Sequence, residues 1–135
     1  MKKFVVIAAV LLTACAVSPS AFATKEFHEV WVKVYVDKSE NEDFKKLATE
    51  AKCNICHIDG ENKKKHNPYG ETLEHDGLTK KNFPAAKFKQ KPDEVRKEVE
   101  EILKKAEEKK AEKAEKTFGE RIQEGLLPGG DKLGK

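Results

Sequence analysis

Methionine and cysteine are both scarce in this chain. Of its 135 residues, only Met1 is a methionine, and the three cysteines are Cys15, Cys53 and Cys56. The first scarcity excludes a thioether ligand or a Met-rich binding surface from the rest of the chain. The second excludes a scaffold held together by many disulfides.

Aromatic residues and an excess of one charge are also lacking. Aromatics make up 7% of the chain, and 27 Lys and Arg face 24 Asp and Glu, with the two signs alternating along the sequence. A nucleic-acid-binding protein usually carries a basic patch and rings that stack on bases. We therefore expect no nucleic-acid partner.

Only one long apolar run is present, at residues 4–17, and it follows Lys2 and Lys3. A Ser/Pro break and the small-residue triplet Ala21-Phe22-Ala23 come next, which is the pattern of a secretory signal peptide. The run is shorter than the roughly 20 residues that span a bilayer. We expect residues 1–23 to be a signal peptide and 24–135 to be one exported domain without a membrane span, in the periplasm or an equivalent compartment.

A rival processing site involves Cys15. Leu12-Thr13-Ala14-Cys15 resembles a bacterial lipobox, in which the cysteine would become a lipid anchor. The helix-breaking Pro19 and the triplet ending at Ala23 favour the first site. Both interpretations place the protein outside the cytoplasm.

The pentapeptide Cys53-Asn54-Ile55-Cys56-His57 admits several interpretations. A disulfide would close a very short loop and contribute little stability. A thioredoxin-like redox pair needs a strand before it and a helix after it, whereas residues 41–52 have a helical pattern. In a c-type haem site the two thiols bind the haem and the histidine binds its iron. Of these three interpretations only the haem site uses the histidine, so we favour it; a zinc site is the remaining alternative.

The apolar spacing predicts an almost wholly helical domain. Apolar residues at helical spacing begin at Phe27, although the β-branched residues of 30–36 leave a strand possible there. The other expected segments are a helix over 41–52, a loop over 59–69, a short helix over 71–75, an irregular stretch over 82–92, a long helix over 91–116 and a last short helix after Thr117.

The long helix is the best signalled of these. Pro92 suits its first turn, and an apolar stripe runs through Val95, Val99, Ile102, Leu103 and Ala106. Beyond Ala106 the stripe thins, so we expect "EEKKAEKAEK" to be a solvated helical arm held by Glu–Lys pairs four residues apart. Thr117 to Glu120 has the form of a capping box.

The order of these features resembles small class I c-type cytochromes. A helix, the Cys53–His57 motif, the sequence Asn67-Pro68-Tyr69-Gly70 and C-terminal helices follow one another over residues 41–126. The layout "AKCNICH…KKKHNPYG…TFGERIQEGLLPGG" is also similar to short monohaem cytochromes of planctomycete-type bacteria. The resemblance implies an all-α domain around one covalent haem c, with iron on His57. It also implies that the Pro68 carbonyl accepts from the His57 ring.

Aromatic side chains are the expected walls of that haem pocket. They are Phe27, Trp31, Tyr35, Phe44, Tyr69 and Phe118, among which Trp31 and Tyr69 are the predicted cofactor contacts.

The sixth iron ligand departs from the family. Class I cytochromes usually supply a methionine, and Met1 is the only one here. His28 is the first candidate because it stands in apolar company, where a polar ring needs a partner. His75 is the second candidate, and His66 is expected to brace its loop. A lysine, a residue of a partner chain or an open sixth position would also agree with the sequence.

These expectations define two functions. The first is single-electron transfer by an exported cytochrome of low potential, since a donor stronger than methionine favours ferric iron. The second is binding or sensing of nitric oxide or carbon monoxide at an open or displaceable sixth site. The partners considered are a redox protein and a second cytochrome subunit. Lysines 63–65 and 80–81 are ordinarily solvated; their functional interpretation is a ring of charge that attracts an acidic redox protein. No acid–base pair or nucleophile has a recognisable spacing, so we do not expect an enzyme.

Overall fold

The computed structural model describes residues 22–62 and 65–135, with side chains from Lys25 onward. The predicted signal peptide therefore falls almost entirely outside the described residues, as does Cys15. The first helix begins at Phe22 and so includes the last two residues of that predicted segment.

Eight helical segments make up the described part of the chain. They are α1 (Phe22–Trp31), the π-helix η2 (Val32–Val36), α2 (Glu42–Ala51), the 3₁₀-helix η3 (Lys52–Ile55), α3 (Pro68–His75), α4 (Ala85–Gln90), α5 (Pro92–Glu107) and α6 (Phe118–Gln123). No strand occurs within 22–62 or 65–135, which confirms the all-helical prediction. Within the same ranges, no helix is long and apolar enough to cross a bilayer.

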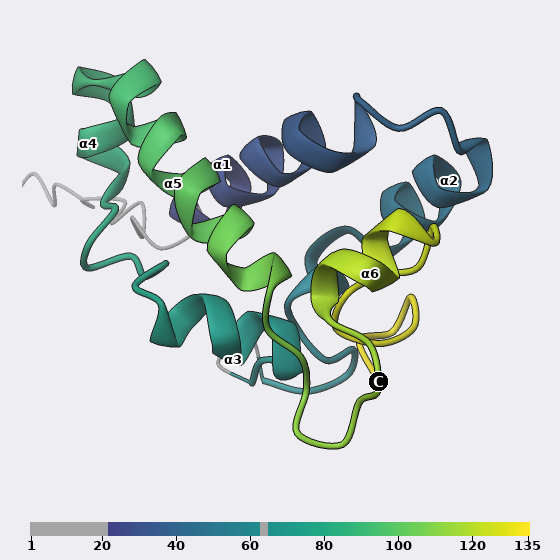
Figure 1. The fold of residues 1–135 in the computed structure, drawn as a ribbon. Helices are drawn as coiled ribbons and strands as arrows, with labels where there is room; N and C mark the ends of the chain where they lie inside the picture. Colours follow the sequence, from purple (N-terminus) through teal and green to yellow (C-terminus); the bar gives the residue numbers. More distant parts are fainter. Residues whose placement is uncertain (1–21, 63–64) are drawn as a thin grey trace, which may run out of the picture.

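Helix α5 is the centre of the fold. It packs against α1, α3, α4 and α6 (Figure 1). Four of the five residues of its predicted stripe, Val95, Val99, Leu103 and Ala106, are at most 1% exposed, whereas Ile102 is only partly buried. Pro92 occupies the first turn as expected.

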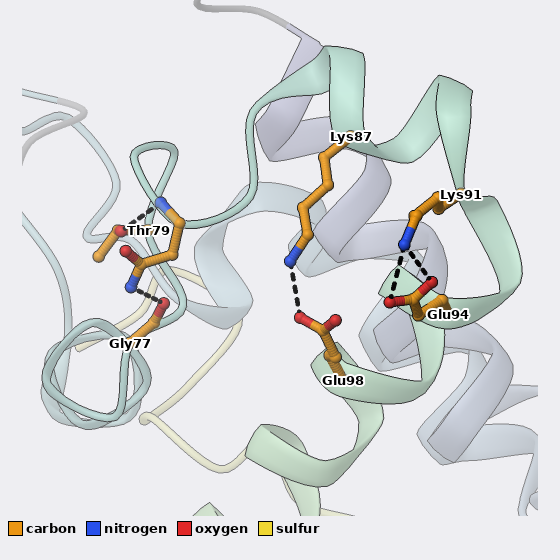
Figure 2. A network of polar contacts seen from close by, with 7 residues as sticks. Gly77, Thr79, Lys87, Lys91, Glu94 and Glu98 are labelled. Atoms are coloured by element: carbon orange, nitrogen blue, oxygen red, sulfur yellow. Dashed lines mark hydrogen bonds and ion pairs between the residues drawn. The ribbon is translucent and has the colours of Figure 1, made fainter.

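A polar corner joins α4 to α5. Lys87 of α4 donates to Glu98 of α5 at 2.8 Å, and Lys91 contacts Glu94 at 2.9 Å (Figure 2).

The prediction that 82–92 is irregular was wrong, because residues Ala85–Gln90 form α4 and bury Phe88. Burial of that ring against the core decides the local structure despite the two flanking prolines.

The strand considered for residues 30–36 does not form. This segment completes α1 and continues as η2, where the Asp37 N–H donates to the Val32 carbonyl at 2.9 Å. Val34, Tyr35 and Val36 are buried there. Tertiary burial therefore overrides the β preference of the valines.

The helical arm predicted over the end of 91–116 was also wrong. Helix α5 ends at Glu107, and residues 108–116 form turns. The Phe118 N–H donates to the Lys109 carbonyl at 2.7 Å, so the chain doubles back and buries Phe118 at 1% exposure. Burying that ring is worth more than exposed Glu–Lys pairs, which contribute about 0.3–0.5 kcal/mol each.

Two predicted helix starts have side-chain caps. Asn41 begins α2 and accepts from the Phe44 N–H at 3.1 Å. Thr117 and Glu120 form the predicted capping box of α6. The short helix predicted over 71–75 exists but begins three residues earlier, at Pro68.

Candidate functional site

The Cys53–His57 motif forms a single tight turn directly after α2. Lys52 ends that helix with a positive φ of 49°, a conformation that non-glycine residues rarely adopt. The Cys53 carbonyl then accepts from the N–H groups of Cys56 at 3.2 Å and His57 at 3.0 Å. The two thiols and the imidazole are thereby carried on one short hydrogen-bonded segment.

The two thiols lie in different surroundings. Cys53 is exposed, whereas Cys56 packs against the hydrophobic core. Burial, and secondarily the nearby Cys53, raise the pKa of the Cys56 thiol to about 12. Cys56 is therefore a neutral thiol at pH 7, facing the protein interior.

The two predicted aromatic contacts lie together, and one of them, Tyr69, is near Cys56. The Trp31 indole N–H donates to the Tyr69 hydroxyl at 3.2 Å, and Tyr69 is fully buried. Burial raises the pKa of Tyr69, and a nearby Cys56 adds to that rise. The ring of Phe118 contacts Tyr69 edge-on, with ring centroids 5.2 Å apart. The inner side of Cys56 is thus bordered by aromatic surface.

The same polar chain continues to a residue that sequence reasoning missed. Tyr35 lies near Tyr69, and its hydroxyl donates to Glu107 Oε1 at 2.8 Å. Burial of Tyr35, aided by these two neighbours, raises its pKa. No local pattern indicated Glu107, because it lies 72 positions from Tyr35 and ends a different helix.

The His57 ring contacts the following loop. Its Nδ1 lies 3.4 Å from the Lys65 carbonyl, and its ring faces that of His66 with centroids 4.6 Å apart. His57 and His66 also pair as an isolated antiparallel bridge. His66 Nδ1 lies 3.0 Å from Glu74 Oε2 on α3. His66 therefore has the bracing position expected for it.

Pro68 was predicted to place its carbonyl at the His57 ring. In the structure Pro68 begins α3, and its carbonyl accepts from the Thr72 hydroxyl at 2.9 Å. The Lys65 carbonyl lies 3.4 Å from His57 Nδ1. A hydrogen bond between His57 and Pro68 stays a prediction.

Asn67 was missed as a site residue, although it is 1% exposed and ties the turn to α3. Its side-chain N–H₂ donates to the carbonyls of Asn54 at 3.2 Å and Ile55 at 3.0 Å. Its side-chain oxygen caps α3 by accepting from the Gly70 N–H at 2.9 Å. Asn before Pro is an N-cap signal that could have indicated part of this role.

Gly70 completes this contact between the turn and α3. A Cβ at Gly70 would overlap the carbonyl oxygen of Cys56. The backbone of the turn therefore lies directly on the first turn of α3.

The two candidate distal histidines lie away from these contacts. His28 lines an open groove of about 300 Å³ whose described lining is completed by Glu29, Val32, Lys33 and Asp37. Its Nε2 is buried without a described hydrogen-bond partner, and burial lowers its pKa. His75 has an 87% exposed side chain beside Asp76.

The turn offers the donor set of a covalent haem. Cys53 is exposed, Cys56 is partly buried near Tyr69, and His57 is partly buried. Within the described ranges, no three His, Cys, Asp or Glu side chains converge as ligands for a bare metal ion. Two thiols and an imidazole on one short segment are the groups that could hold a cofactor through two thioethers and one imidazole.

Comparisons with protein-family models, with curated proteins and with solved structures found no match to this chain.

Proposed function

We propose that the chain is an exported monohaem c-type cytochrome that transfers single electrons between redox proteins. The observation that carries this proposal is the turn itself. Two thiols of unlike exposure and a histidine follow one another on a hydrogen-bonded segment. The partly buried thiol of Cys56 lies near Tyr69, whose hydroxyl accepts from Trp31. A cytochrome c-like domain is the fold that this proposal implies, with no enzymatic activity of its own.

Cys53 and Cys56 would hold the haem and His57 its iron. The haem would supply a metal centre that cycles between ferric and ferrous states. The protein would supply orientation, because Asn67 and Gly70 hold the backbone of the turn while Lys65 and His66 lie against the His57 ring. Trp31 and Tyr69 would exclude water from the side of the buried thiol.

A second candidate function is binding of a diatomic gas. His66 is engaged with Glu74, and His75 is largely exposed beside Asp76. With Met1 the only methionine, these placements favour a weak or exchangeable sixth ligand. His28, with its unpaired Nε2, remains the first candidate for that position.

The test is expression of the full chain in a bacterial host that attaches haem c, followed by mass spectrometry under denaturing conditions. We expect the mass of one haem to be retained, and to be lost in Cys53→Ala/Cys56→Ala. Cys15→Ala is the matched control, because it removes the third cysteine and should keep the haem. Haem that stays covalently bound in the double variant, or that never attaches to the parent chain, would overturn the proposal.

Spectroscopy of the loaded protein separates the two functions. A low-spin ferrous haem that ignores carbon monoxide, with a potential below that of His/Met cytochromes, supports electron transfer. A ferrous haem that binds carbon monoxide supports the gas-binding function. If His28 is the distal ligand, His28→Ala converts the first result into the second, while His75→Ala does not.

A further inference from the structure

The last seven residues of the chain, 129–135, lie across the back of the Cys53–His57 turn. The Leu133 carbonyl accepts from the Asp59 N–H at 2.8 Å, and the Lys132 carbonyl accepts from the Asn54 side chain at 3.3 Å. Gly134 is buried, and a Cβ there would overlap the carbonyl oxygen of His57. We call residues 129–135 the C-terminal strap.

The C-terminal strap has an internal structure of its own. The Asp131 carboxylate accepts from the N–H groups of Leu133 at 2.8 Å and Lys135 at 3.1 Å. The Asp131 N–H donates to the Lys135 carbonyl at 3.0 Å, which closes the loop. These internal hydrogen bonds give residues 131–135 a defined local structure.

Helix α6 anchors the strap. The Arg121 guanidinium donates to the Leu127 carbonyl at 2.9 Å and to the Gly130 carbonyl at 3.2 Å. Gly129 lies against the Asn67 side chain, which itself holds the turn. The strap is therefore tied on one side to α6 and on the other to the residues that contact the motif.

We propose that the C-terminal strap is a positioning device for His57. Its Gly134 lies against the His57 carbonyl, and its Leu133 carbonyl accepts from the Asp59 N–H. Lys65 and His66 contact the His57 ring. An imidazole held at both its backbone and its ring has little freedom to rotate. Gly134 is the central residue of this contact, since only a residue without a Cβ permits the close approach. The inference rests on the proposed function, because it assigns a purpose to the orientation of His57.

Two glycines provide a matched pair for the test. Gly134 and Gly60 both have left-handed backbones, with φ of +72° and +75°, so alanine imposes similar conformational strain at each. A Cβ at Gly60 meets nothing within 4 Å, whereas one at Gly134 meets the turn. Any difference between Gly134→Ala and Gly60→Ala therefore reports on contact with His57 rather than on strain.

The first measurement is hydrogen exchange at the Asp59 amide in the purified full chain. We expect Gly134→Ala to lower its protection factor at least tenfold and Gly60→Ala to leave it within twofold of the parent. Equal protection in the two variants would overturn the proposal. If Gly134→Ala does not fold, Asp131→Ala loosens the strap without adding an atom, and unchanged Asp59 protection in that variant would overturn it equally.

The second measurement uses the haem-loaded chain. Gly134→Ala should shift the midpoint potential and split or broaden the low-spin paramagnetic signal, while Gly60→Ala keeps both at their parental values. A potential that moves equally in both variants would contradict a positioning role. Failure of haem to attach would overturn the proposed function, whereas attached haem with unaltered Asp59 exchange would overturn only the strap.

Discussion

Helix α5 and the Cys53–His57 turn are held in place by different forces. Helix α5 presents a stripe of apolar side chains, Val95, Val99, Leu103 and Ala106, and almost no surface of these residues remains exposed. The turn presents mainly its backbone, which receives the Asn67 side chain, the first turn of α3 at Gly70 and the C-terminal strap. The first region depends on side-chain volume and the second on hydrogen bonds and close backbone approach.

This difference determines how each region tolerates change. An apolar core loses stability in proportion to the volume removed, and neighbouring side chains can relax into part of the space. A backbone contact that admits only glycine, or a buried carbonyl with a single amide donor, cannot relax in this gradual way and is either made or lost. We therefore expect α5 to govern global stability and the turn to govern local geometry.

The largest effect is expected in the core. Leu103→Ala should lower the free energy of unfolding by about 2–5 kcal/mol, because Leu103 is 1% exposed and a cavity would remain. Urea unfolding followed by circular dichroism measures this loss. Ile102→Ala on the same helix is the control, and its partly exposed side chain should cost clearly less. Equal costs at the two positions would show that α5 does not bury the stripe described above.

A smaller but more local effect is expected at Asn67. Asn67→Ala should cost about 2–3 kcal/mol, since it removes a helix cap and also leaves the Asn54 and Ile55 carbonyls without their amide donor. Asn41→Ala removes only a helix cap, that of α2, and should cost about 1 kcal/mol. Urea unfolding of both variants tests the difference. A cost at Asn67 no greater than at Asn41 would mean that its bonds to the turn contribute nothing.

The side-chain packing of α5 could be predicted from the sequence, whereas the backbone contacts of the Cys53–His57 turn could not. Burial of Val95 to Ala106 repeats with the helical period, and the Thr117–Glu120 capping box is a local pattern, so both were predicted correctly. The motif itself was visible as Cys-x-x-Cys-His. Its contacts with Lys65 and with Gly134 were not visible, because they join a turn to a loop and to the distant end of the chain.

The predictions that failed share one cause. Residues 108–116 have strong helix formers and opposite charges four residues apart, yet the chain turns there so that Phe118 can reach the core. The same reasoning applies to Phe88 in α4 and to the valines of η2. In each case a long-range apolar contact of a few kcal/mol outweighs local preferences of a few tenths. Local patterns cannot show which ring will be buried.

The smallest effect tests that correction directly. Lys97 lies within α5 and Lys113 within the turns of 108–116, and both are exposed. Lys97→Gly should cost about 1 kcal/mol, as glycine does inside an exposed helix. Lys113→Gly, which removes the same side chain and the same charge, should cost less than about 0.3 kcal/mol, because no helix is interrupted there. Urea unfolding with helical circular dichroism compares the two. An equal loss of unfolding free energy at Lys113 and Lys97, with a matching loss of helical signal, would show that the helix continues to residue 116 as first predicted.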